Sequence, residues 1–266
     1  MKAVFTLTSS ESKRLLAKAV AKLPQVQEAL AGGMVIVAGG TTNAFVLEEL
    51  TGEKVENKAR YTAGIITRGR QCMTPAGERV APVVLEKGQK STMNWMEAVE
   101  KMQAGDVFIK GGNAIDDKGN VGVLLANPVA GTIGKALPIV VARGCHLILP
   151  VGLEKMIPDV ILAANVAGIQ TFEKSIGMRV GLMPVSYGLP ITEIEALEIL
   201  FDVDTYCISA GGVGGSEGSI VLAVEGEVES INDVMALIKN IKGEPPVPSL
   251  KQKCADCENK CSIMEP

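Results

Sequence analysis

Short blocks of hydrophobic and polar positions alternate along the chain and predict helices and strands in turn. Thr8 and Glu11 have the spacing of a capping box, and apolar residues follow at helical intervals until Pro24. Residues 34–38 form a short apolar run that ends in a turn rich in glycine and threonine, and a second helical pattern follows. The chain therefore opens with a helix, a strand, a tight loop and a helix.

The same alternation continues to residue 241. Further strands are predicted at 65–66, 83–85, 107–109, 121–125, 146–149, 180–183, 206–209 and 220–224. Further helices are predicted at 92–102, at 131–142 with a kink at Pro138, at 191–200 and at 228–241. Strands that alternate with helices are typical of parallel sheets with crossover helices. The pattern predicts an α/β fold with a Rossmann-like, layered and mostly parallel sheet.

The composition agrees with such a fold. Of 266 residues 47% are apolar and only 3% aromatic, so the core consists of aliphatic side chains, as in strands buried on both faces. The net charge is -4 without a basic block, and no apolar stretch approaches the roughly 20 residues of a membrane span. The start of the chain lacks the pattern of a secretion signal. We therefore expect a cytoplasmic protein with no nucleic-acid or membrane partner.

A proline-rich segment divides the chain. Three prolines at 245–248 cannot continue the preceding helix and predict a stiff, extended linker. We expect residues 1–242 to form the α/β domain, and residues 243–266 to form the linker and a cysteine-rich tail.

Three of the six cysteines lie in this tail, where Cys254, Cys257 and Cys261 have the spacing C-x2-C-x3-C. In a reducing compartment such clustering favours a metal over disulfides. The spacing matches the closing half of ferredoxin-type motifs and favours a [4Fe-4S] cluster, with zinc as the alternative cofactor. A tail that binds no metal is the plain alternative.

Three cysteines leave the fourth ligand open. A cluster can leave one iron open to substrate, or take a ligand from Cys72, Cys145, Cys207 or a second subunit. Zinc can be completed by His146 or by a carboxylate such as Asp256. Because Cys145 and His146 begin an apolar strand, we expect both to be core residues.

Two glycine-containing loops are candidate ligand sites. The first joins a strand to a helix, where backbone N–H groups attract an anion, and an ordinary turn with Thr41 as N-cap is the alternative. The second fails the dinucleotide spacing and leads into a strand, so a flexible hairpin competes with a ligand loop. The candidate residues are Gly39, Gly40, Thr41, Thr42 and Asn43 in the first loop and Gly214, Gly215, Ser216 and Glu217 in the second.

Several motifs together resemble one superfamily. Residues 38–50 (AGGTTNAFVLEEL) and 105–120 (GDVFIKGGNAIDDKGN) are similar to two signatures of the NagB/RpiA/CoA-transferase-like superfamily. Residues 119–158 resemble more closely the lactate-utilisation (LUD) domains, which commonly accompany iron–sulfur modules. The resemblance implies the layered α/β fold and a ligand site that includes Lys110, Gly111, Gly112 and Asn113. An exposed strand-end lysine is the alternative for Lys110.

These features predict a metal-dependent LUD-like protein that binds a small anionic metabolite between the first loop and the 111–116 turn. Its chemistry is either redox or Lewis-acid, so an iron–sulfur oxidoreductase and a lyase or transferase both stay open. One alternative is an acyl-CoA or sugar-phosphate enzyme with a structural zinc tail. Another is a non-enzymatic iron–sulfur accessory that docks on a redox partner protein. A homodimer is expected by analogy with the superfamily.

Overall fold

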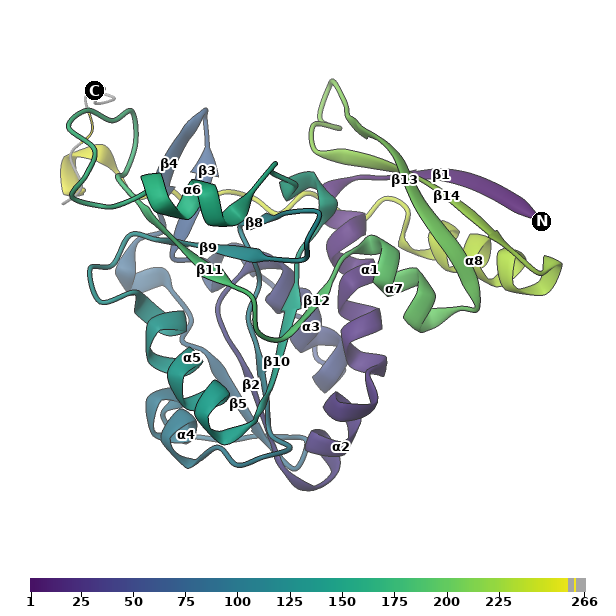
Figure 1. The fold of residues 1–266 in the computed structure, drawn as a ribbon, viewed down its shortest axis with the longest axis horizontal. Helices are drawn as coiled ribbons and strands as arrows, with labels where there is room; N and C mark the ends of the chain where they lie inside the picture. The colour runs from purple at the N-terminus through teal and green to yellow at the C-terminus, as the bar shows by residue number, and fades with distance from the viewer. Residues whose placement is uncertain (258–260, 262–266) are drawn as a thin grey trace.

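The computed structural model describes residues 1–257 and 261, in which eight α-helices and four β-sheets form a mixed α/β fold (Figure 1). The α-helices are α1 (Ser9–Lys22), α2 (Pro24–Gly32), α3 (Thr41–Thr51), α4 (Trp95–Lys101), α5 (Gly131–Arg143), α6 (Val160–Val166), α7 (Glu193–Leu200) and α8 (Val228–Ile241). The strands are β1 (Lys2–Leu7), β2 (Met34–Val37), β3 (Gly64–Thr67), β4 (Arg70–Met73), β5 (Val83–Glu86), β6 (Gln89–Lys90), β7 (Val107–Ile109), β8 (Ala114–Ile115), β9 (Val121–Leu125), β10 (His146–Pro150), β11 (Gly181–Val185), β12 (Leu189–Ile191), β13 (Val203–Gly211) and β14 (Ser219–Gly226).

The predicted capping box starts α1. The Thr8 hydroxyl accepts a hydrogen bond from the Glu11 N–H, and the Glu11 carboxylate accepts one from the Thr8 N–H (2.9 Å). Pro24 opens α2 at its first position, where the missing N–H is tolerated. The helix predicted to run up to Pro24 is confirmed as α1, whereas α2 was not predicted.

The central sheet is mixed, with strand order β12-β10-β7-β2-β5-β6. Its neighbours β12, β10, β7 and β2 are parallel, whereas every other described strand pair is antiparallel. The fold prediction is therefore confirmed in part: the protein is α/β and four strands of the central sheet are parallel, but the other sheets of the described chain are antiparallel. Short turns join β5 to β6, β8 to β9 and β13 to β14, and a connection that short can only return antiparallel.

Hydrophobic clusters cover both faces of the central sheet. Alternate residues of β2 point to opposite sides, so Val35 and Val37 join one cluster while Met34 and Ile36 join the other. Figure 1 shows α1 and α3 on one side of this sheet and α4 and α5 on the other. This arrangement leaves the carboxyl ends of the parallel strands at one edge of the sheet.

A second sheet combines a strand from the start of the α/β domain with two strands from near its end. β1 pairs with β14, which also pairs with β13, and α8 packs on their inner face. β1 was not predicted, although Phe5 and Leu7 alternate with exposed neighbours as a half-buried strand requires.

The proline-rich linker lies against the main body. The Glu244 carboxylate accepts a hydrogen bond from Arg14 Nε (2.9 Å), and the Gly243 N–H donates to Glu11 Oε1 (2.9 Å). The chain then reaches the β3–β4 hairpin (Figure 1). Part of the predicted tail, 258–260 and 262–266, lies outside the described residues. Among the described helices none has the length and apolar character that crossing a bilayer requires.

Candidate functional site

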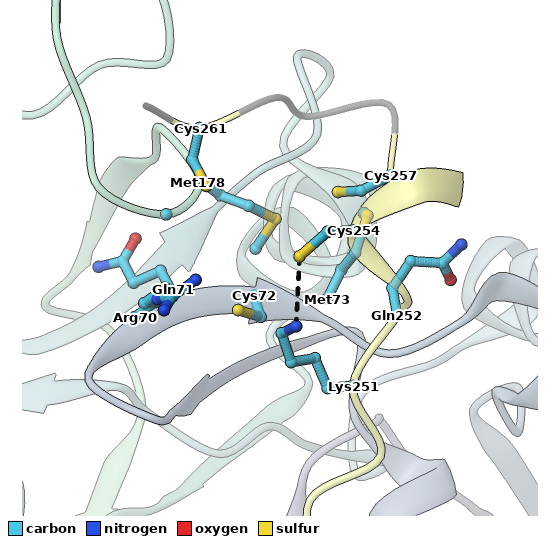
Figure 2. Close-up of a pocket in the computed structure, with 11 residues that line it drawn as sticks. Arg70, Gln71, Cys72, Met73, Met178, Lys251, Gln252, Cys254, Cys257 and Cys261 are labelled. Carbon is cyan, nitrogen blue, oxygen red and sulfur yellow. Dashed lines mark hydrogen bonds between the residues drawn. The ribbon is translucent and has the colours of Figure 1, made fainter. Parts of the chain in front are cut away.

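A surface pocket brings together segments that are far apart in the sequence (Figure 2). Its lining consists of Arg70, Gln71, Cys72, Met73, Gly177, Met178, Lys251, Gln252, Cys254, Cys257 and Cys261. Three of the lining cysteines are the predicted metal ligands of the tail, and the fourth, Cys72, comes from β4. Figure 2 shows Cys257 and Cys261 entering the pocket from the tail while Met178 reaches in between them.

Main-chain hydrogen bonds attach two distant segments to β4. The Gln252 N–H donates to Met73 O (2.8 Å), and the Met178 N–H donates to Gln71 O (2.9 Å). Gly177 is required at this junction, because its φ is +93° and a Cβ atom would lie 2.7 Å from Gln71 O. Cys72 therefore sits between the tail and the 177–178 segment.

The thiols share one electrostatic environment. Burial raises the pKa of the Cys72 thiol, Cys254 and Cys261 act in the same direction, and Lys251 and Arg70 act in the opposite one. The Lys251 ammonium also donates a hydrogen bond to Cys254 Sγ (3.3 Å). Two cations thus lie beside four sulfur atoms that would be thiolates when bound to a metal.

The thiols surround the pocket without converging on one point. Within residues 1–257 and 261, no three Cys, His, Asp or Glu side chains have the geometry to hold a single metal ion. The donor set is thiol-rich, so it suits a soft metal centre such as zinc or iron–sulfur.

The other candidate fourth ligands lie elsewhere. Cys145 is buried in the core, as expected, and its Sγ donates to Gln103 O (3.2 Å). Cys207 is exposed on β13, away from the pocket lining. His146 was expected in the core, but it is exposed, because it lies at the amino-terminal end of β10, whose other four residues are buried.

The first glycine loop and the 110–113 turn lie side by side at the carboxyl ends of β2 and β7. Asn43 Nδ2 donates to Ala38 O (2.8 Å) and to Ile109 O (3.2 Å), so it joins the two strand ends. The N-cap of α3 is Gly40, with φ +148°, so the alternative that placed Thr41 there is wrong. At Gly112 a Cβ atom would lie 2.5 Å from Val121, which is why the turn needs glycine.

The residues of the 110–113 turn have different partners. Lys110 is partly buried and its Nζ donates to Gly111 O (2.8 Å). Burial, together with a smaller effect of the Lys155 charge, lowers the pKa of Lys110 to about 8. Asn113 instead accepts a hydrogen bond from the Leu124 N–H (3.0 Å) and so shapes the β8–β9 hairpin.

The second glycine loop is the turn of the β13–β14 hairpin, as the simpler interpretation of the sequence predicted. The Gly215 N–H donates to Glu217 Oε2 (2.9 Å), a contact within the loop. At Gly218 a Cβ atom would lie 2.8 Å from Glu154 Oε2. The hairpin therefore lies beside residues 153–155, but no hydrogen bond in the described chain joins 214–217 to the first loop.

Three charged residues near the strand ends were missed in the sequence. Glu154 and Lys155 lie in the short helix η3 (Leu153–Lys155) after β10, and Glu193 begins α7 after β12. Lys155 Nζ donates to Gly112 O (3.0 Å), and Glu193 Oε2 accepts from the Leu153 N–H (2.8 Å). Burial raises the pKa of Glu193. Their position after strands was a signal, but the proximity of Lys155 to Lys110 depends on the strand order.

The fold and the pocket define a mixed α/β protein with four cysteines around one surface pocket. No protein-family model and no curated protein sequence matches this chain.

Proposed function

We propose that this protein carries a [4Fe-4S] cluster bound by Cys72, Cys254, Cys257 and Cys261. The observation that carries the proposal is that Cys72, from a distant hairpin, lines the same pocket as the three tail cysteines. Four cysteine thiolates are the usual ligand set of such clusters. The fit is chemical, because the pocket supplies four soft sulfur donors and two neighbouring cations.

The spacing of the tail cysteines favours a cluster over zinc. C-x2-C-x3-C matches the closing half of ferredoxin-type motifs, in which each cysteine binds a different iron. Zinc, which four thiolates can also bind, is the alternative metal for the same pocket.

A fourth protein ligand favours electron transfer over Lewis-acid chemistry. With four thiolates every iron is occupied, so none is open to a substrate. Lys251 and Arg70 offset the negative charge of a reduced cluster, and the Lys251–Cys254 hydrogen bond further stabilises the reduced state. We propose an iron–sulfur oxidoreductase or electron carrier that exchanges electrons with a redox partner protein.

The α/β body would bind the small anionic metabolite on which this chemistry acts. In open α/β sheets ligands bind outside the carboxyl ends of parallel strands. In this protein the first glycine loop, the 110–113 turn and residues 153–155 meet at those ends. A layered body of the NagB/RpiA/CoA-transferase-like kind, closest to the LUD domains, is part of this proposal.

Metal and sulfide analysis of protein purified without oxygen tests the cluster. We expect about four irons and four sulfides per chain and a broad visible absorption that bleaches on reduction with dithionite. Stoichiometric zinc without sulfide would contradict the proposal and favour a structural tail on an acyl-CoA or sugar-phosphate enzyme. Protein that cannot be loaded with iron and sulfide by chemical reconstitution would also contradict it.

A further inference from the structure

Two lysines meet at the carboxyl ends of neighbouring parallel strands. Lys110 follows β7, and Lys155 ends the short helix that follows β10. Lys110 Nζ donates to Gly111 O (2.8 Å), and Lys155 Nζ donates to Gly112 O (3.0 Å). Because these carbonyls are consecutive, both ammonium groups lie at the same turn.

No carboxylate contacts the lysine pair directly. In the described part of the chain neither Lys110 nor Lys155 forms an ion pair, and the nearby Glu154 pairs with Lys13 (3.3 Å). Two like charges at a partly buried site are costly unless an opposite charge joins them. Sites that keep such a charge pair are often functional sites.

The protonation of both lysines responds to this environment. Burial lowers the pKa of Lys155 to about 8; Lys13 on α1 acts in the same direction, and Glu154 and Glu193 act against it. Lys110, also with a pKa of about 8, faces the charge of Lys155. A bound anion would hold both lysines in the charged form.

We propose that Lys110 and Lys155 together bind one oxyanion group, a carboxylate or a phosphate ester, of a small ligand. The inference rests on the proposed function and deepens it by naming the groups that hold the metabolite, and it assigns Lys155 as a binding residue. The consecutive carbonyls of Gly111 and Gly112 accept hydrogen bonds from both amines and hold them at one turn. A side chain at Gly112 would collide with Val121 and Val151.

An NMR titration tests the pair with two probes. Sulfate, which stays doubly charged and stands in for a phosphate ester, and acetate, a simple carboxylate, are each added against chloride of equal ionic strength. We expect the Gly111 and Gly112 amide signals to shift saturably with at least one probe. Preference for sulfate assigns a phosphate ester and preference for acetate a carboxylate, and both outcomes support the lysine pair.

Lysine variants show whether the amines are responsible. Lys110→Met and Lys155→Met should each weaken binding at least tenfold, and Lys155→Arg should retain it. Lys118→Met, at a surface lysine with 68% exposure, is the matched control and should stay within twofold of wild type. Shifts that are equal in wild type and both methionine variants, or no saturable shift with either probe, would overturn the proposal.

The pH profile of the wild type keeps the proposal testable if a variant fails to fold. Affinity for the preferred probe should fall as pH rises from 7 to 9.5, since the lysines lose their protons with a pKa of about 8. An affinity that does not change over this range contradicts the pair. Iron analysis of the same samples separates the two proposals, because a full cluster without anion binding overturns only this one, and anion binding without iron only the other.

Discussion

The cysteine pocket and the lysine pair are built in opposite ways. The pocket joins a surface hairpin to the end of the chain, and few main-chain hydrogen bonds, such as Gln252 N–H to Met73 O, connect the two. The lysine pair stands on the ends of β7 and β10, two central strands of a sheet with a hydrophobic cluster on each face. A site of the first kind needs its metal to hold its parts together, whereas a site of the second kind is formed by the fold itself.

Removal of the cluster should give the largest difference between the two regions. Without metal, trypsin should cleave after the exposed Lys253 at least about tenfold faster, because local opening near the tail then costs little. Cleavage after Lys118, an exposed lysine of the main body, should keep its rate. Mass spectrometry of timed digests of cluster-loaded and cluster-free protein measures both rates. Equal acceleration at both lysines would mean that the metal stabilises the whole fold.

Arg14 connects the linker to the α/β domain, so its substitution should weaken the contact that leads the chain to the cysteine pocket. Its guanidinium contacts Glu48 (2.6 Å), Glu49 (2.9 Å) and Glu244 (2.9 Å) and is only 16% exposed. Arg14→Met leaves Glu244 without its cation, while Glu48 keeps only Lys58 and Glu49 only Lys18, and it should lower the free energy of unfolding by about 3 kcal/mol. Lys18→Met removes a single ion pair with Glu49 that is more exposed, and it should lower the free energy of unfolding by less than about 1 kcal/mol. Urea denaturation measures both, and equal losses would contradict the connecting role of Arg14.

The glycine hairpin beside Glu154 offers a sharper test of the preformed region. Gly212 has φ +135° and a Cβ atom there would lie 1.8 Å from Ser216 O, whereas Gly211, at φ +141°, has open space. Gly212→Ala should therefore cost about 2 kcal/mol and Gly211→Ala about 1 kcal/mol, since only the first adds a collision to the backbone strain. Thermal unfolding compares the two variants. A larger cost for Gly211→Ala would contradict the close approach of Gly212 to Ser216.

The smallest effect concerns pH and the lysine pair. A lysine whose pKa is lowered on folding binds fewer protons in the folded state between about pH 8 and its unfolded value, so stability rises with pH across that range. Lys155→Met removes the penalty and should be more stable than wild type by about 1 kcal/mol at pH 7. The difference should shrink between pH 8 and 10. Denaturation curves at several pH values measure it, and a constant difference would show that burial of the Lys155 charge is not its cause.

Much of the secondary structure could be predicted because local periodicity determines it. The capping box of α1, the strand–loop–helix at residues 34–51 and α8 all follow from patterns within a few residues. The sheet pairing could not be predicted in the same way. β1 pairs with β14 across almost the whole chain, and the hydrophobic pattern of a strand does not name its partner.

Each candidate site likewise contains residues that local sequence patterns reveal and residues that only the fold brings into place. The spacing of Cys254, Cys257 and Cys261 is local and visible, but three cysteines elsewhere were equal candidates for the fourth position. Cys72 is distinguished only by the folding of the tail onto β4. Lys155 becomes a candidate binding residue only because β7 pairs with β10, which brings its side chain to the turn after Lys110.

The most direct test of the central claim compares Cys72→Ser with Cys207→Ser, a substitution at an exposed cysteine outside the pocket. Iron and sulfide per chain are measured in both variants after identical anaerobic purification. A cluster on four cysteines predicts that Cys207→Ser keeps the wild-type content, whereas Cys72→Ser loses iron or retains a cluster with an altered visible and EPR spectrum. Wild-type content and spectra in Cys72→Ser would contradict the assignment of Cys72 as the fourth ligand.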